Sequence, residues 1–158
     1  MIRFSKMADY GVLLLGHFVR HADELTSSNA LSEAYHMPQS VVANLLKEFC
    51  KGGLLESKRG LHGGYRLAKP AESITLLEVL GVIDGPVQLT DCAAEQVLDS
   101  CDYTDVCPSR SPMRAVNGRI VQFLDSLTLS ELLNDVPVQP LPETAASSPT
   151  SSSSTLDS

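Results

Sequence analysis

The chain has 158 residues, of which 43% are hydrophobic and 5% aromatic, and its formal net charge is −7. This length suits a small domain with an appendage, and the hydrophobic content excludes a wholly disordered chain. The charge is uneven, because residues 1–85 carry nine basic and nine acidic side chains whereas residues 86–158 carry three and ten. The acidic total therefore does not exclude a nucleic-acid binder, which needs only a local basic face.

The start of the chain predicts a cytoplasmic protein that does not enter a membrane. Residues 1–6 lack the long apolar run of a signal peptide, and the apolar stretch from Val12 to Leu15 is too short to span a bilayer. In a reducing compartment the four cysteines are expected to be metal ligands, redox groups or core residues rather than a disulfide framework.

Three helices are predicted in the first third of the chain. Residues 6–20 show helical periodicity after Ser5 as N-cap, and a short second helix is expected over residues 30–35. A third helix has Pro38 in its first turn and runs to about Lys51. The tight connection before it predicts a helix-turn-helix, although a plain α-hairpin in another bundle has the same pattern. The face of this helix opposite its apolar residues is polar. Candidate base contacts are Gln39, which can pair bidentately with adenine, and Ser40, Val41, Ala43 and Lys47.

The other side chains of note in these helices are assigned to structure. His17 and His36 are expected in helix packing, and Cys50, beside Phe49, is expected to be a partly buried thiol.

A glycine-rich β-hairpin is predicted directly after the third helix. Two short strands, residues 54–58 and 65–68, flank a tip at residues 59–64. A hairpin in this position makes a winged helix, and its basic tip can reach phosphates or the minor groove, although a solvated turn is the alternative. A local basic cluster is formed by Lys58, Arg59, Arg66 and Lys69. The candidate contacts here are Lys58, Arg59, His62 and Gly63. Gly63 and Gly64 would allow close approach of the backbone, and Tyr65 is expected in the core.

The second half of the chain predicts two further helices and a tail. Residues 75–78 form a capping box that opens a helix to about Ile83. Ser111 is the expected cap of a longer helix whose apolar residues form a heptad seam. This helix either pairs with a second copy, which we favour, or packs on the chain's own first helix. Residues 137–158 are rich in Pro, Ser and Thr and are expected to be disordered. The seam consists of Met113, Val116, Ile120, Phe123 and Leu127.

Three of the four cysteines lie in an acidic, loop-like stretch with the spacing C-x8-C-x5-C: Cys92, Cys101 and Cys107. Structural cysteines normally lie among apolar neighbours, so thiolates in this setting favour a soft metal or an iron–sulfur cluster. A structural zinc ion or a redox-switched disulfide is the alternative, although zinc sites usually include a close pair of cysteines that this stretch lacks.

Several segments resemble the Rrf-type winged-helix regulators, a family with IscR-like and NsrR-like members. The segments are residues 3–11 (RFSKMADYG), 59–68 (RGLHGGYRLA) and 74–80 (ITLLEVL), the last followed by Asp84-Gly85-Pro86. Residues 85–92 (GPVQLTDC) are most similar to the branch that regulates the SUF system of iron–sulfur assembly. The resemblance covers roughly residues 1–133. It implies a homodimeric repressor that binds double-stranded promoter DNA, carries a 2Fe-2S or 4Fe-4S cluster and controls cluster-assembly genes.

The resemblance also implies the cluster ligands. Cys92, Cys101 and Cys107 match the family's three cysteine positions. IscR-like members add a histidine three residues after the last cysteine, where this chain has Arg110, and arginine cannot ligate iron. NsrR-like members use a carboxylate from the first helix of the partner subunit, and Asp9 matches that position. Solvent, a small thiol or another side chain are the alternative fourth ligands, and Asp9 can also be an acid that the helix dipole alone favours in the first turn.

The sequence therefore predicts a mainly α fold with a small β-hairpin wing, that is, a winged helix-turn-helix plus a long dimerisation helix. We expect a regulator rather than an enzyme, because no second cofactor motif or catalytic set is present. An electron-transfer protein and a winged helix that binds protein are the competing interpretations. The expected parts are a DNA-binding domain at 1–85, a cluster-binding loop at 86–110, a dimerisation helix and terminal turn at 111–136, and the tail at 137–158.

Overall fold

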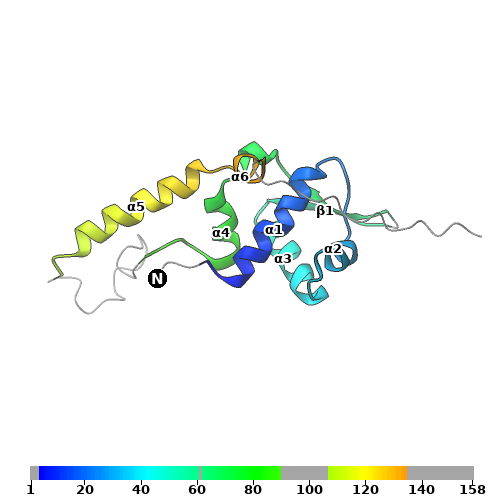
Figure 1. Ribbon diagram of the computed structural model, residues 1–158, viewed down its shortest axis with the longest axis horizontal. Helices are drawn as coiled ribbons and strands as arrows, with labels where there is room; N and C mark the ends of the chain where they lie inside the picture. The colour runs from blue at the N-terminus through cyan, green and yellow to red at the C-terminus, as the bar shows by residue number, and fades with distance from the viewer. Residues whose placement is uncertain (1–3, 61, 90–106, 135–158) are drawn as a thin grey trace, which may run out of the picture.

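The computed structural model describes residues 4–60, 62–89 and 107–134. It confirms the mainly helical fold with a small β-hairpin wing and a long further helix (Figure 1). The predicted tail, residues 137–158, lies outside the described residues. In chain order the elements are α1 (Lys6–Arg20), α2 (Ser28–Tyr35), α3 (Gln39–Lys51), β1 (Leu55–Lys58), β2 (Gly64–Leu67), the 3-10 turn η1 (Ala71–Ser73), α4 (Leu76–Asp84), α5 (Arg110–Ser126) and α6 (Leu129–Asn134).

Local capping signals account for the starts of three helices. Ser5 caps α1 as predicted, through a hydrogen bond that its side chain accepts from a backbone amide of the first turn. Both halves of the capping box between Thr75 and Glu78 are present before α4. The helix α2 begins at Ser28, two residues earlier than predicted, because Ser27 is its cap.

Two predicted helix starts are wrong, that of α3 by one residue and that of α5 by two. Pro38 is the N-cap of α3 rather than part of its first turn, since its ψ of 131° is extended and the helix begins at Gln39. The helix α5 begins at Arg110, so Ser111 lies inside the first turn and is not the cap. Ser109 precedes the helix without a side-chain capping bond. In both places the backbone conformation, rather than the residue type, determines where the helix starts.

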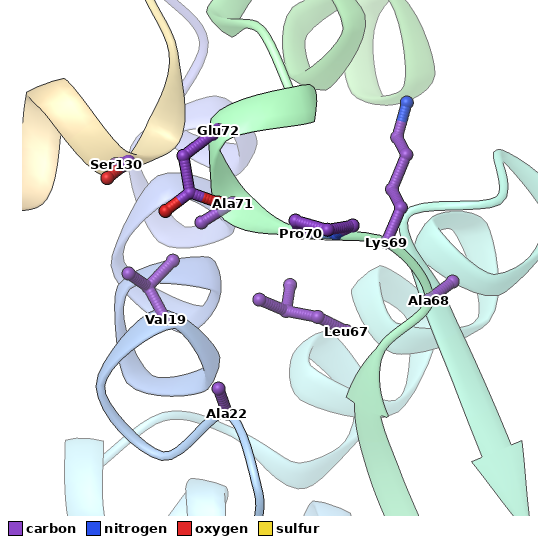
Figure 2. A pocket seen from close by; sticks show the side chains of 9 residues that line it. All are labelled: Val19, Ala22, Leu67, Ala68, Lys69, Pro70, Ala71, Glu72 and Ser130. Carbon is purple, nitrogen blue, oxygen red and sulfur yellow. The ribbon is translucent and has the colours of Figure 1, made fainter.

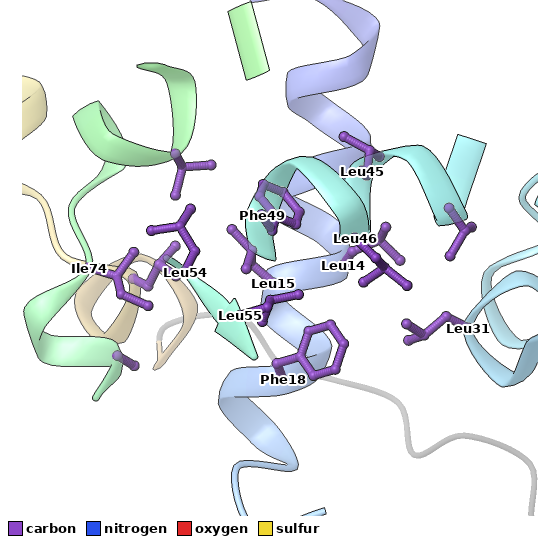
Figure 3. Packing of buried hydrophobic residues seen from close by; sticks show 14 of the residues in the cluster. Leu14, Leu15, Phe18, Leu31, Leu45, Leu46, Phe49, Leu54, Leu55 and Ile74 are labelled. Atoms are coloured by element: carbon purple, nitrogen blue, oxygen red, sulfur yellow. The ribbon is translucent and has the colours of Figure 1, made fainter. Parts of the chain in front are cut away.

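An apolar core joins α1 to α3, to the hairpin and to α4 (Figure 3). Leu14, Leu15 and Phe18 of α1 are fully buried, and so are Leu46 and Phe49 of α3. Each such side chain contributes about 1.5–3 kcal/mol to folding through burial. The core therefore fixes α3 on α1 and leaves the opposite face of α3 toward solvent. The same cluster includes Leu31, Leu54, Leu55, Ile74, Val79 and Leu129.

The hairpin is held to the core by a third extended segment. In the hairpin, β1 and β2 pair antiparallel, with Lys58 opposite Gly64. Thr26, just before α2, forms an antiparallel bridge with Tyr65, in which each backbone amide donates to the other residue's carbonyl, at 3.0 and 2.9 Å. Tyr65 packs half-buried on the core, as predicted. The helix-turn-helix and the wing are thus joined by backbone hydrogen bonds.

The C-terminal half of α5 packs on α4. Leu124 lies in a second apolar cluster with Ala8, Leu76 and Leu80. Two backbone bonds of 2.8 Å reinforce this contact, from the Leu76 amide to the carbonyl of residue 127 and from the amide of residue 129 to the carbonyl of residue 74. These bonds join backbone atoms, so the attachment of the end of α5 to the start of α4 does not depend on side-chain identity.

The heptad seam of α5 is divided between two environments. Ile120 and Leu127 pack against the second cluster within the chain. Val116 and Phe123 are 42% and 62% exposed. The first half of α5 extends away from the other helices in Figure 1. Over the described ranges, none of the helices has the length and apolar character that crossing a membrane requires.

Replacing Gly64 with alanine is expected to loosen the wing. An added Cβ at Gly64 would lie 2.9–3.0 Å from backbone atoms of Thr26, which cannot rotate away as a side chain can. We expect Gly64→Ala to lower the free energy of unfolding by about 1–3 kcal/mol, measured by urea denaturation. The control is Gly81→Ala in α4, where no atom lies within 4 Å and the helix should gain about 1 kcal/mol. A Gly64→Ala protein as stable as the unsubstituted chain would contradict this role of the bridge.

Candidate nucleic-acid interface and cysteine site

The helix α3 presents a polar face to solvent, as predicted. Gln39, Ser40 and Lys47 are exposed, while Val42, Leu45, Leu46 and Phe49 on the opposite face are buried. Of the other candidates, Ala43 is exposed, but Val41 is half-buried against the core, so only part of it is available for contact. Asn44, which the sequence prediction did not nominate, is exposed on the same face.

Two residues of α2 join this face, and the sequence prediction missed both. The Gln39 side-chain amide donates to Ser28 Oγ at 3.1 Å and to Asn29 Oδ1 at 2.6 Å. The helix α2 therefore brings its first turn beside the first turn of α3. The signal for this contact in the sequence is weak, because Ser and Asn at a helix start normally indicate capping.

The wing carries two basic side chains that remain available. Lys58 and Arg59 are exposed, and among the described residues neither forms an ion pair. Arg66, on the same hairpin, pairs with Glu56 on the neighbouring strand. Lys69 is also paired, with its Nζ 2.7 Å from a carboxylate oxygen of α4. Of the basic cluster predicted from the sequence, two members are thus compensated within the chain and two are not.

Gly63, which was predicted to allow close approach of DNA, is required by the geometry of the hairpin itself. A Cβ at Gly63 would collide with the Lys58 carbonyl oxygen and lie 2.9 Å from that of Gly60. The Gly63 amide donates to the Gly60 carbonyl at 3.0 Å. The tight tip therefore requires glycine at this position whether or not DNA approaches it. Beside it, His62 is exposed and lines a hollow of about 500 Å³ that also includes His17.

His17 connects α1, α2 and the segment that holds the wing. It is 4% exposed, with Nδ1 3.2 Å from the Tyr35 hydroxyl and Nε2 3.0 Å from the Thr26 hydroxyl. The expectation that His17 serves helix packing is therefore confirmed. Burial, followed by the charges of His21 and Arg20, lowers the pKa of His17 to about 4. The ring is neutral near pH 7, with one nitrogen donating and the other accepting.

The matching expectation for His36 was wrong. This residue is exposed and lies at the turn between α2 and α3, where its φ of 51° is in the left-handed region. Its backbone ends α2, so its position is set by the turn rather than by side-chain packing.

The structure describes the two ends of the cysteine loop, up to Leu89 and from Cys107 onward. One end is connected to α5 by a hydrogen bond and the other by the chain itself. Before the loop, the Leu89 amide donates to the buried side chain of Asn117 in α5 at 2.9 Å. After the loop, Cys107 is half-buried and lies three positions before the first residue of α5. Cys92 and Cys101 lie outside the described residues. A change in the conformation of this loop would therefore act directly on α5.

The donor types at this site suit an iron–sulfur cluster better than a hard cation. Three thiolates from one loop are soft ligands. Asp9 is exposed in the first turn of α1. Within residues 4–60, 62–89 and 107–134, no three His, Cys, Asp or Glu side chains are arranged to hold a metal ion. The fourth cysteine, Cys50, packs half-buried against the core, as predicted, and burial raises the pKa of its thiol.

A second hollow, of about 570 Å³, lies where α1, β2 and η1 meet (Figure 2). Val19 and Leu67 lie beside it, and the Lys69 side chain extends away from it toward its partner in α4. The residues that line this hollow bring no set of titratable groups together, so we assign no reaction to it.

The chain is similar to known transcriptional regulators along most of its length. A family model, Rrf2, described as iron-dependent transcriptional regulator, matches residues 4–135. The HTH-type transcriptional regulator IscR of Photorhabdus laumondii is 32% identical over 135 residues, which are 85% of this chain and 80% of that protein.

Two solved structures have the same fold. The structure of T. potens IscR superposes with a TM-score of 0.64 at 25% identity, covering 85% of this chain and 88% of that one. CymR, described as the global cysteine regulator of B. subtilis, superposes with a TM-score of 0.66 at 22% identity, covering 87% of this chain and all of CymR.

Stability is expected to fall at mildly acidic pH because of His17. The unfolded histidine has a pKa of 6.5 and the folded one about 4, so between these values the unfolded chain binds more protons. This contribution is complete above pH 6.5 and is lost as pH falls toward 4. It should amount to about 2 kcal/mol between pH 7.5 and pH 5, measured by urea denaturation.

The variant His17→Gln retains a donor and an acceptor and should remove most of this pH dependence. His62→Gln, at an exposed position, is the matched control and should leave it in place. Equal pH dependence in His17→Gln and the unsubstituted chain would assign the effect to other groups.

Proposed function

The chain belongs to the Rrf2 family of transcriptional regulators, and from that premise we propose that it is a repressor whose operator affinity responds to an iron–sulfur cluster. Family membership makes it a DNA-binding transcriptional regulator and not an enzyme. The proposal adds the residues that contact DNA, the cofactor, the dimer and the target genes. It places the protein in the cytoplasm, where promoter DNA is accessible.

The exposed polar face of α3 beside an uncompensated basic wing is the observation that carries the DNA proposal. In this arrangement α3 lies in the major groove, with Gln39, Ser40 and Lys47 toward the base edges and phosphates. Lys58 and Arg59 reach the neighbouring backbone or minor groove, because their charges are not paired within the described chain. The remaining nominated contacts are Val41, His62 and Gly63.

The exposed seam of α5 supports a homodimer. Val116 and Phe123 are large apolar side chains left open to solvent, one heptad apart on the same helix. Pairing with α5 of a second copy would bury both. A two-fold dimer also presents two recognition helices to a palindromic operator, which is how most helix-turn-helix regulators gain specificity.

The cluster proposal assigns Cys92, Cys101 and Cys107 as ligands, with Asp9 of the partner subunit as the fourth. A bound cluster would supply iron–sulfur bonds that order the loop and that oxidants can break. Because Leu89 and Cys107 attach the loop ends to α5, a change in the loop would reposition α5 and the paired DNA-binding domains. The likeness of residues 85–92 to the SUF-system branch supports cluster-assembly genes as targets.

These assignments divide the chain as the sequence predicted. We propose a DNA-binding domain at residues 1–85, a cluster-binding loop at 86–110, a dimerisation helix with a terminal turn at 111–136, and an appended tail at 137–158. Only parts of the loop and none of the tail lie within the described residues.

Removing the wing charges is expected to weaken DNA binding in a salt-dependent way. The double variant Lys58→Ala/Arg59→Ala should bind a promoter fragment about tenfold more weakly, and the slope of log affinity against log salt should fall by about 1 for each phosphate that the wing no longer neutralises. Fluorescence anisotropy over a salt series measures both. Arg66→Ala is the matched control, because this cation is already paired on the same hairpin, and its affinity should change less than about twofold. Equally weakened binding in both variants would show that the wing tip has no special role.

The visible absorption of the protein is expected to depend on the cysteines of the loop. Protein purified without oxygen should absorb in the visible region, and Cys92→Ala and Cys107→Ala should each abolish that absorption while leaving the dimer intact in sedimentation. Cys50→Ala is the control, since that thiol packs on the core of the DNA-binding domain, and its spectrum should be unchanged.

A regulator with a zinc ion or a thiol/disulfide switch is the competing function. Colourless oxygen-free protein whose promoter affinity changes with a thiol reductant would establish the disulfide switch instead of the cluster. Stoichiometric zinc in colourless protein would establish the zinc site.

A further inference from the structure

The side chain of Gln39 has one free hydrogen-bonding atom. Its amide nitrogen carries two hydrogens, and both are used, one by Ser28 Oγ at 3.1 Å and one by Asn29 Oδ1 at 2.6 Å. The carbonyl oxygen Oε1 has no such partner among the described residues. The tip of this exposed side chain therefore offers an acceptor, and not a donor, to whatever approaches α3.

The backbone that carries Gln39 is held to α2 by a proline and by hydrogen bonds within the turn. Gln39 is the first residue of α3, and Pro38 before it has a φ that the proline ring holds at −57°. Met37 is buried, and its carbonyl accepts from Ser32 Oγ at 2.6 Å while its amide donates to the Ser32 carbonyl at 3.1 Å. The left-handed turn at His36 completes the connection. The position of Gln39 relative to α2 is thus fixed by several bonds at once.

Ser28 and Asn29 are not occupied by capping α2. That role belongs to Ser27, whose Oγ accepts from the Ala30 amide at 3.2 Å. The side chains of Ser28 and Asn29 are consequently free to hold the amide of Gln39. Contacts between two polar side chains are a minority of protein hydrogen bonds. Two of them on the amide nitrogen of Gln39 favour the rotamer that directs this nitrogen toward α2.

We propose that Ser28 and Asn29 are positioning residues that restrict Gln39 to recognising an exocyclic amino group on one base of the operator. This inference rests on the proposed function, in which α3 enters the major groove. There adenine presents its N6 amino group and cytosine its N4 amino group, whereas guanine O6 and thymine O4 are acceptors. Gln39 Oε1 accepts from the amino groups and is repelled by the carbonyl oxygens. The base facing Gln39 is therefore adenine or cytosine.

This mode of recognition differs from that of an unrestrained glutamine. A free amide pairs bidentately with adenine, accepting from N6 and donating to N7, and so prefers adenine to cytosine. With the donor held by α2, the second bond cannot form and the two amino-bearing bases become equivalent. The bidentate pairing expected from the sequence returns only when the hydrogen bonds to Ser28 and Asn29 are removed.

A selection experiment on the full-length chain tests this proposal. Protein purified without oxygen is incubated with a library of random duplexes about 20 base pairs long, which is about two turns of DNA, and the bound fraction is sequenced over successive rounds. The position read by Gln39 is the one whose base preference disappears in Gln39→Ala. The unsubstituted chain should enrich adenine and cytosine there to within about twofold of each other. The double variant Ser28→Ala/Asn29→Ala should favour adenine over cytosine by about tenfold, the discrimination that a bidentate contact provides.

A conservative variant separates positioning from a merely structural effect. The single variant Asn29→Asp retains an oxygen acceptor for the Gln39 amide. It should enrich adenine and cytosine equally, as the unsubstituted chain does and the double variant does not. All these side chains lie on the surface or partly so, and circular dichroism verifies that each variant is folded.

Three results would overturn the inference. A double variant that enriches the same bases as the unsubstituted chain would remove the positioning role while leaving the proposed DNA binding intact. A Gln39→Ala protein that keeps every base preference would remove Gln39 from the interface with the same consequence. No enriched sequence with any protein would overturn the proposed function and this inference together.

Discussion

The structure depends on α1 being enclosed by the other elements. Leu14, Leu15 and Phe18 are fully buried, and α1 contacts α4, α6 and β2. Because so much of its circumference is apolar, α1 has to be covered on several sides, with α3 and the hairpin on one and α4 on another. Ala8 extends the same helix into the cluster that receives α5. A single helix thereby links the two surfaces on which the proposed function depends.

The two elements that project from this core, the wing and α5, are tied to it by backbone hydrogen bonds. Thr26 and Tyr65 hold the wing, and the pairing of residues 74–76 with residues 127–129 holds the end of α5. Such bonds do not depend on side-chain identity, so they position projecting parts that have little core of their own. In the proposed regulator a movement of α5, driven from the loop between Leu89 and Cys107, would pass to α4 and then to α1.

Signals that act within a few residues were predicted well. The cap at Ser5, the capping box at Thr75 and the hairpin around Gly60 depend on neighbours in sequence, and the structure confirms all three. Predictions that needed the path of the chain were less accurate. The cap at Ser111 and the packing role of His36 were wrong, because the backbone conformation at those points follows from how α5 and α2 meet their neighbours.

By itself the sequence determined the order of the helices, the polar face of α3, the basic wing and the clustering of three cysteines in one acidic stretch. These properties depend on residue type and on periodicity over one or two helical turns. The tertiary structure alone decided which partners the polar side chains find: α2 for Gln39, the Thr26 segment for His17, and Glu56 for Arg66. Those contacts join residues 9 to 11 positions apart across turns between elements. They depend on the angle at which two elements meet, which no local pattern specifies.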